Sequence, residues 1–406
     1  MQWREPIAPI REPGIGSVKR VAIVTLTLLK YREPFYERLR RRLEDLGVEL
    51  VLLVGEPDEF DTSRGLVGEV DGVVRIKHRS FEIPRRQLVW QQCLTATRTA
   101  DLVIVEQASR LLVNYALLAL RRSRRQKVAF WGHGADHSDH RSPLGESVKR
   151  AISRRVDWWF AYTDQTARLV ADTGFPEDRI TVVQNATDTS DLGQQVRRVT
   201  QTDIEAFRSR YSLAQGPTGT FLGSLYPDKR VDHLLQASDH IRCALPEFQL
   251  VIAGGGPEET AIKQEAESRP WVHVVGPQLG ADLGTLLRIT DLTLIPAWAG
   301  LVVVDSFAAG VPPVASASLP HGPEIAYVND GINGRMVEDS GDPQRYAQAV
   351  IELLRSPAKL QTLREGAARA GSHYTIEAMV TRFADGVMSA LSSDASAGQE
   401  PRSPQP

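Results

Sequence analysis

The chain has 406 residues, which is too long for one compact core, so we expect two domains. Its 42% hydrophobic and 24% charged residues are ordinary for a globular protein, and no apolar run approaches the roughly 18 residues that span a bilayer. Two distant cysteines, Cys93 and Cys243, exclude a disulfide framework and a zinc site of cysteines. These features predict a cytoplasmic protein.

Charge is distributed unevenly along the chain. The net charge is −2, yet residues 1–190 hold 30 Lys and Arg against 25 Asp and Glu. Basic clusters lie at 40–42, 121–127 and 149–155. One interpretation is a weak peripheral contact with an anionic membrane, and the other is a set of solvated helix faces. No pattern is typical of nucleic-acid recognition, so we expect no nucleic-acid partner.

In the first half, apolar segments of four to eight residues alternate with amphipathic ones, as in a parallel sheet covered by helices. The helix over 30–47 is indicated by a stripe of Phe35, Leu39 and Leu43 and by Gly47 after it. In chain order we predict a strand over 21–29, that helix, a strand over 48–55, a peripheral loop and weak strand over 56–80, a helix over 88–99, a strand over 100–107, a helix over 111–122, and strands over 127–134, 158–163 and 179–188.

The alternation restarts after a polar stretch at 188–219, which contains one predicted helix over 203–211. We predict strands over 221–225, 249–256, 272–276, 292–296 and 311–315, helices over 301–309, 342–354 and 375–391, and a disordered polar tail from 392. The predicted fold is α/β, with two doubly wound Rossmann-like domains that face a cleft. The predicted divisions are an acceptor-side domain over 1–192, a nucleotide-sugar domain over 193–372, a helix over 373–391 that packs back on the first domain, and a tail over 392–406.

The stretch from Asp291 to Val337 organises the second half. A strand, a turn ending at Gly300 and a helix beginning at Leu301 leave amide N–H groups free to bind an anion. Asp305 lies one turn further along the same helix face, where a carboxylate suits a ribose diol. The alternative is an ordinary crossover with a solvated aspartate.

Several segments together resemble the family 4 glycosyltransferases of the GT-B fold. In chain order they read VDWWFAYTDQTARLVADTGFPEDRITVVQNATD, FLGSLYPDKRVDHLL, LPEFQLVIAGGGPE, GLVVVDSFAAGVPPVAS and PEIAYVNDGINGRMV. The resemblance implies a sugar transfer from a nucleotide-diphosphate donor to an acceptor hydroxyl, with retention at the anomeric carbon and no bound metal or other cofactor.

The resemblance also implies roles for particular residues. Lys229 corresponds to the lysine that binds the diphosphate, and a fixed positive charge there would stabilise the leaving group. His133 corresponds to a histidine that contacts the donor sugar near the reacting carbon. The predicted donor contacts are Gly223, Lys229, Arg230, Gly254, Gly300, Leu301, Val302 and Asp305, and the predicted substrate contacts are Tyr31, Arg32, Glu106 and Asn185.

The chain departs from the family pattern in three places. Ala297 stands where the family has a glutamate, Asp305 stands for a second glutamate, and Ser224 replaces an arginine. Either the donor contacts are different or activity is lost. Glu324, which we predict to be catalytic, and His321 are hypothetical compensating groups.

Two other functions remain possible, a nucleotide-sugar epimerase and a catalytically silent sugar-nucleotide-binding protein. A cluster of His137, His140, Asp136 and Asp139 could suggest a metal, but one loop offers no evident geometry and we predict no metal site.

Overall fold

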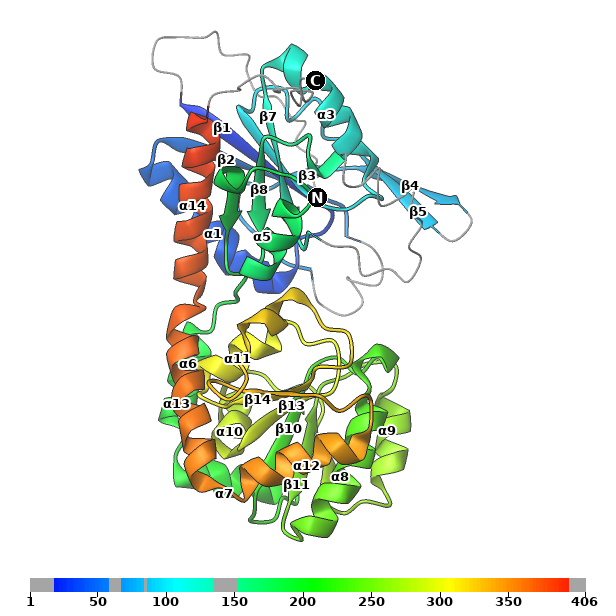
Figure 1. The fold of residues 1–406 in the computed structure, drawn as a ribbon. Helices are drawn as coiled ribbons and strands as arrows, with labels where there is room; N and C mark the ends of the chain where they lie inside the picture. The colour runs from blue at the N-terminus through cyan, green and yellow to red at the C-terminus, as the bar shows by residue number, and fades with distance from the viewer. Residues whose placement is uncertain (1–17, 58–66, 84–85, 135–151, 394–406) are drawn as a thin grey trace, which may run out of the picture.

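The computed structural model describes residues 18–57, 67–83, 86–134 and 152–393. Two α/β domains lie one above the other, the N-terminal half of the chain forming the upper one in Figure 1. Each domain contains one parallel sheet, and together they confirm the predicted GT-B architecture. The predicted tail from 394 onward lies outside the described residues.

The first sheet has the strand order β3-β2-β1-β6-β7-β8-β9, and every neighbouring pair is parallel. Its strands are almost wholly apolar because both faces are buried. They are β1 (Lys19–Thr25), β2 (Val48–Gly55), β3 (Val74–Ile76), β6 (Leu102–Glu106), β7 (Lys127–Gly132), β8 (Trp158–Ala161) and β9 (Ile180–Val182).

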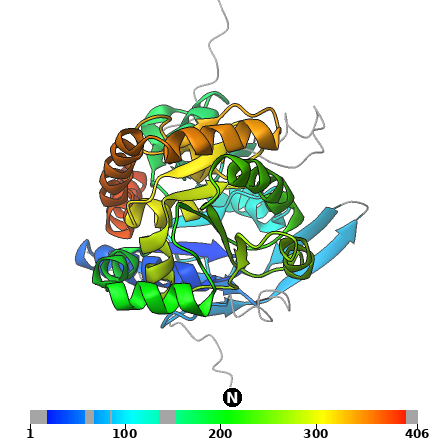
Figure 2. The ribbon, with the colours of Figure 1, turned by 90° about the horizontal axis from the view of Figure 1, so that it is seen from below.

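The second sheet has the order β12-β11-β10-β13-β14-β15 and is also parallel throughout. Helices enclose it on both sides, as Figure 2 shows from below. Its strands are β10 (Thr218–Leu222), β11 (Gln249–Ala253), β12 (Val272–Val274), β13 (Leu292–Ile295), β14 (Pro313–Ser316) and β15 (Arg335–Val337).

Several helices begin at a proline or at a capping side chain. Pro34 lies in the first turn of α1, and the hydroxyl of Thr375 accepts a hydrogen bond from the amide of Ala378 at the start of α14. The α-helices are α1 (Glu33–Asp45), α3 (Leu112–Arg124), α5 (Asp164–Ala171), α6 (Ser190–Arg198), α7 (Gln201–Arg210), α8 (Val231–Ala244), α9 (Glu259–Ala266), α10 (Gly280–Ile289), α11 (Val302–Ala308), α12 (Pro343–Leu354), α13 (Pro357–His373) and α14 (Ile376–Ser392).

The last two helices connect the domains. Helix α13 packs against α11 of the second domain, and α14 runs up the side of the first domain against α1 (Figure 1). The ring of Phe383 stacks on Phe160 of β8 with 4.3 Å between centroids. The predicted return of the C-terminal helix to the first domain is therefore confirmed. In the part of the chain that the structure describes, no helix has the length and apolar character needed to cross a membrane.

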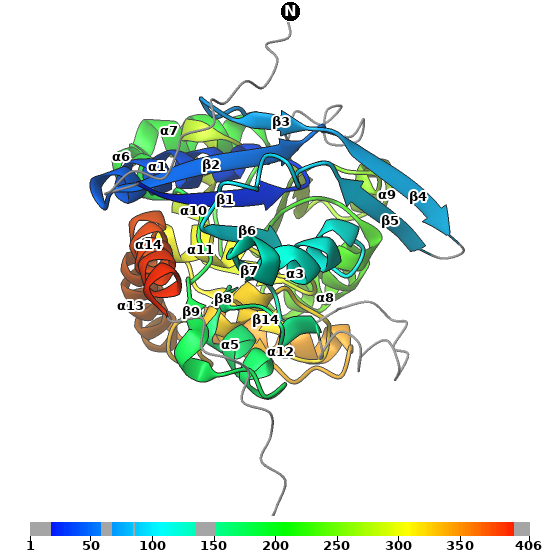
Figure 3. The same cartoon turned by 90° about the horizontal axis from the view of Figure 1, so that it is seen from above.

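One predicted helix is wrong. Residues 88–99 form part of β5 (Arg86–Gln91) and a series of turns, and β5 pairs antiparallel with β4 (His78–Ile83). This two-stranded ribbon projects from the first domain in Figure 3. Val89 and Gln91 are buried while Gln87 is exposed, so the segment follows the two-residue alternation of a strand. Helix α6, in the polar stretch before the second sheet, was also missed.

Candidate active site

The two sheets share a topology that predicts where a ligand binds. In the second domain β10 lies between β11 and β13, so the strand order reverses there, and such switch points bind ligands at the carboxyl ends of the strands. The corresponding position in the first domain lies between β1 and β6. The candidate site is the space between these two switch points.

Two loops of the second domain come together at its switch point. Lys229 ends a short 3-10 helix (Pro227–Lys229) after β10, and its ammonium donates a hydrogen bond to the carbonyl oxygen of Trp298, 2.5 Å away, in the turn after β13. Burial lowers the pKa of Lys229. The structure therefore places the predicted phosphate-binding lysine at the predicted anion-binding turn, 69 residues further along the chain.

The turn presents its amide groups to the same space. In the described part of the chain, no protein acceptor contacts the amide N–H groups of Gly300, Leu301 or Val302. These groups stand at the start of α11, where the helix dipole also favours negative charge. An anion held here would meet three N–H donors and the Lys229 ammonium.

Hydrogen bonds from a neighbouring loop fix this turn. The amide of Trp298 donates to the carbonyl of Pro320 at 2.7 Å, and the amide of Ala299 donates to Nδ1 of His321 at 3.0 Å. Nε2 of His321 lies 2.6 Å from the carbonyl of Ser316 and must donate to it. A ring that accepts at one nitrogen and donates at the other is neutral, and burial lowers the pKa of His321. His321 therefore supports the turn and is not placed as a compensating group in the cavity.

The glycines of this region have separate reasons for their small size. At Gly254, with φ of +155°, a Cβ would lie 1.8 Å from the carbonyl oxygen of Gly223, so glycine is required by the close approach of two backbones. At Gly223 a Cβ would meet no atom closer than 3.8 Å. Glycine is therefore required at Gly254 by the close contact and is favoured at Gly223 by its φ of +153°.

Asp305 lies one turn into α11 and is largely buried. Burial raises its pKa to about 6, and the neighbouring hydroxyl of Thr187 opposes that shift. Thr187 belongs to the segment that connects the domains. The carboxylate lies one turn beyond the amides and faces the linker, and its contact with a ribose stays a prediction.

Three predicted residues, Arg230, Glu324 and Asn185, have side chains bonded to other protein groups. The guanidinium of Arg230 bonds Asp232 at 3.0 Å on the surface. The Glu324 carboxylate accepts a hydrogen bond from the side-chain amide of Asn185, and burial raises its pKa. Glu324 and Asn185 therefore join the two domains, together with Tyr327, whose hydroxyl donates to the carbonyls of Tyr162 and Asn185.

The switch point of the first domain is built from side chains. Arg32 is buried, and its guanidinium carbon lies 5.1 Å from the ring centroid of Tyr31, 5.2 Å from that of Trp131 and 5.8 Å from that of Tyr162. The ring of Tyr31 is 43% exposed. Glu106 accepts hydrogen bonds from the hydroxyl of Thr25 and, at 3.3 Å, from the amide of Leu26, and burial raises its pKa. Sequence reasoning had grouped Tyr31, Arg32 and Glu106, and they share this strand edge.

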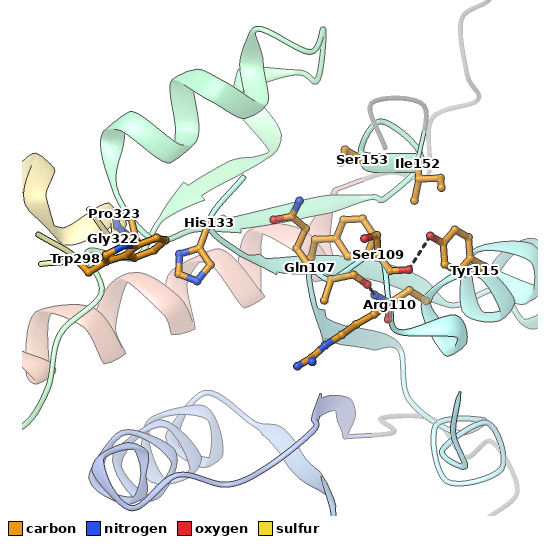
Figure 4. A pocket seen from close by; sticks show the side chains of 13 residues that line it. Gln107, Ser109, Arg110, Tyr115, His133, Ile152, Ser153, Trp298, Gly322 and Pro323 are labelled. Atoms are coloured by element: carbon orange, nitrogen blue, oxygen red, sulfur yellow. Dashed lines mark hydrogen bonds between the residues drawn. The ribbon is translucent and has the colours of Figure 1, made fainter. Parts of the chain in front are cut away.

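A cavity of about 400 Å³ lies between the domains. His133, which directly follows β7, lines one side of the cavity. The centroid of its ring lies 4.5 Å from the centroid of the Tyr162 ring. Figure 4 shows the imidazole between Trp298 and Gln107. The cavity is lined by Gln107, Ala108, Ser109, Arg110, Asn114, Tyr115, Phe130, His133, Ile152, Ser153, Trp298, Gly322 and Pro323.

Most of these lining residues were not predicted. Gln107 and Arg110 follow β6, and Tyr115 lies on α3. The signal available in the sequence was their position at the end of a buried strand, where loops carry ligand contacts in such sheets. None of the described residues that line the cavity is acidic, and Arg110 carries its one permanent charge.

Among the residues with described positions, no group of three or more His, Cys, Asp or Glu side chains could hold a metal ion. His137, His140, Asp136 and Asp139 lie outside the described residues.

Comparisons with known proteins agree with this geometry. A family model described as "Glycosyltransferase Family 4" matches residues 33–191, and one described as "Glycosyl transferases group 1" matches residues 203–370. The chain is 25% identical to a D-inositol 3-phosphate glycosyltransferase of Thermobispora bispora, over 95% of this chain and 93% of that relative.

Solved structures share the fold. The Anabaena protein HepE in complex with UDP aligns with a TM-score of 0.67 at 16% identity, over 91% of this chain and all of that one. HepE has also been solved with UDP-glucose, and that structure aligns with a TM-score of 0.64. Sucrose-phosphate synthase of Thermosynechococcus elongatus aligns with a TM-score of 0.65 at 17% identity, over 91% of this chain and 98% of that one.

The fold, the paired switch points and the two family matches define a glycosyltransferase with the GT-B fold. The two matched regions follow one another and together cover most of the chain, which belongs to glycosyltransferase family 4.

Proposed function

We propose that the protein transfers a sugar from a nucleotide-diphosphate donor to an acceptor hydroxyl with retention at the anomeric carbon. The observation that carries this proposal is the meeting of the Lys229 ammonium with the turn whose amides, at Gly300, Leu301 and Val302, have no protein acceptor. Negative charge develops on the leaving diphosphate, and the ammonium and the amides are the positive groups that would receive it.

The bond changes balance without a protein base. The bond from the anomeric carbon to the phosphate oxygen breaks, the acceptor oxygen bonds the same carbon from the same face, and the acceptor proton passes to the leaving phosphate. No described residue lining the cavity is an Asp or Glu that could take the proton on the opposite face. His133 lines the cavity, and we propose that its imidazole hydrogen-bonds the sugar next to the reacting carbon. Closure of the domains would exclude water.

A UDP-sugar is the donor that we propose, because the fold relative HepE binds UDP and UDP-glucose. For the acceptor we propose a small hydroxylated anion. The relatives act on D-inositol 3-phosphate, and the cavity combines the Arg110 guanidinium with the amide of Gln107 and the hydroxyls of Ser109 and Tyr115. A guanidinium suits a phosphate, and neutral amides and hydroxyls suit a polyol.

The test of the donor is a thermal-shift screen against UDP, GDP, ADP, dTDP and their hexose conjugates. A ligand at 100 times its dissociation constant stabilises by roughly 2.7 kcal/mol. We expect the largest shift with a UDP-sugar, a lost shift in Lys229→Ala and an unchanged shift in Arg230→Ala. Arg230 is a matched control because it is the adjacent cation and bonds Asp232. Equal losses in both variants would contradict the assignment.

Product analysis separates this proposal from its alternatives. Retention predicts that the anomeric configuration of the donor is kept in the product, which NMR of the product reports. An epimerase would give an altered nucleotide-sugar without an acceptor, and a silent binding protein would give a thermal shift without product. The cavity contains no described acidic side chain to flank the sugar, which favours transfer over epimerisation.

We also propose that the protein works in the cytoplasm and that its basic first domain touches anionic membranes weakly. The excess of Lys and Arg in residues 1–190 supports this contact. Co-sedimentation with vesicles containing 30% phosphatidylglycerol tests it. Binding that disappears in neutral vesicles or at about 0.5 M salt is expected, and equal binding to both kinds of vesicle would contradict it.

A further inference from the structure

Trp298 is a large aromatic residue in the turn between β13 and Gly300. It comes three residues after the end of β13 and two before Gly300, so its Cα lies within roughly 7.6 Å of the Cα of Gly300. Its side chain lines the interdomain cavity together with Gly322 and Pro323, the two other lining residues from the second domain. Figure 4 shows the indole facing the cavity beside His133.

The backbone of Trp298 is fixed in an unusual conformation. Its φ is +48°, which a bulky residue adopts only when its surroundings impose it. Both main-chain groups are bonded: the amide donates to Pro320, and the carbonyl accepts from Lys229. The contacts that fix the turn therefore also fix the backbone from which the indole enters the cavity.

The position of the indole identifies the part of a donor that it meets. A sugar is joined directly to the terminal phosphate, so a diphosphate held by the amides of Gly300 to Val302 would bring the sugar next to the turn that carries Trp298. Trp298, Gly322 and Pro323 offer an aromatic face and small or apolar surfaces, with no acidic side chain. An aromatic face is electron-rich and attracts the C–H groups of a sugar ring.

We propose that Trp298 is a specificity-determining residue whose indole stacks on the C–H face of the transferred hexose. The donor sugar is thus selected by the shape of its apolar face. Donors that keep that face but lack a hydroxyl, such as 6-deoxyhexoses, are expected to be accepted. This inference rests on the proposed donor-binding function.

The test compares the dissociation constants of UDP and UDP-glucose by calorimetry for the whole chain. The dissociation constant of UDP divided by that of UDP-glucose isolates the contribution of the sugar. In Trp298→Ala the ratio should fall by about tenfold while UDP binding changes by less than about twofold. In Trp298→Gly, where glycine tolerates the positive φ, the ratio should fall by the same factor. In Trp298→Phe the ratio should stay close to the wild-type value. Melting temperature verifies folding.

Trp271→Ala is the matched control, because Trp271 is a half-buried tryptophan of the same domain that packs on Arg242 at the opposite end of the strands. Its ratio should stay at the wild-type value. Equal weakening of UDP and UDP-glucose in Trp298→Gly, or an unchanged ratio, would overturn the role of the indole while leaving donor binding intact. Failure of the wild type to bind UDP and UDP-glucose would overturn the donor assignment itself, and the inference with it.

Discussion

The two switch points share one topology and differ in the atoms they present. In the second domain, main-chain N–H groups at Gly300 to Val302 and one lysine face the cleft. In the first domain the guanidinium of Arg32 is enclosed by aromatic rings, and the Glu106 carboxylate is bonded to Thr25. On the proposed function, the amides of the second domain bind the donor diphosphate and the side chains of the first domain bind the acceptor. We therefore call the switch point of the second domain the donor half and that of the first domain the acceptor half.

The largest expected effect tests the donor half. Lys229→Ala removes the fixed charge that meets the leaving phosphate, and kcat/KM for transfer should fall by about 10² to 10³. Arg230→Ala should change it by less than about twofold because the Arg230 guanidinium is paired at the surface. Steady-state kinetics with the donor from the thermal screen measure kcat/KM for the two variants. A large loss of kcat/KM in Arg230→Ala would contradict the claim that Lys229, and not Arg230, meets the diphosphate.

A second prediction concerns the free energy of unfolding, which the buried carboxylate of Asp305 in the donor half is expected to lower. Burial raises its folded pKa to about 6 from 3.8, so the folded state binds the proton more tightly and the free energy of unfolding falls as pH rises through this window. Asp305→Asn removes the penalty, which is absent below about pH 4 and complete above about pH 7. The variant should be more stable by about 2 to 3 kcal/mol at pH 8 and unchanged at pH 4.

Denaturant unfolding at the two pH values measures this effect, and UDP titration on the same samples shows whether the added stability weakens donor binding. A change of equal size at pH 4 and pH 8 would show that the carboxylate ionises normally in the folded protein.

Arg110 tests the acceptor half. Arg110→Ala should raise the acceptor KM by about tenfold for a phosphorylated polyol and leave the donor KM unchanged, since one charge-assisted contact is lost. Arg110→Lys should recover part of the loss. D-inositol 3-phosphate and myo-inositol serve as the charged and uncharged acceptors. An equal rise in KM for both would contradict the claim that Arg110 binds the acceptor phosphate.

The smallest expected effect is that of removing divalent metal ions, which should leave the transfer rate unchanged. If Lys229 and the turn supply all the positive charge, transfer should continue at an unchanged rate in 5 mM EDTA, and added Mg²⁺ or Mn²⁺ should not accelerate it. A rate that falls in EDTA and returns with Mg²⁺ would show that the donor half needs a cation.

Prediction from sequence succeeded where local patterns determine structure. Apolar runs such as 48–55 and 249–253 became strands because burial on both faces leaves a continuous hydrophobic signal. Lys229 and the Gly300 turn were paired through an ordered resemblance of segments, and the structure joins them. The helix predicted over 88–99 failed because its strand alternation was missed.

The side-chain cavity was less predictable. Gln107, Arg110 and Tyr115 carry no spacing signal, and only the folded loop directs them to one space. Glu324 was interpreted as a catalytic group, yet its orientation toward Asn185 depends on how the two domains dock. His321 was identified as polar and near the site, but its two hydrogen bonds to the backbone follow from tertiary geometry alone. Contacts between distant segments, rather than composition, decided these roles.

The most direct measurement is the structure of the protein crystallised with UDP. We predict that the terminal phosphate accepts hydrogen bonds from the amides of Gly300 and Leu301, and that the Lys229 ammonium turns from the Trp298 carbonyl to a phosphate oxygen. A diphosphate bound elsewhere, with Lys229 still on Trp298, would contradict the account.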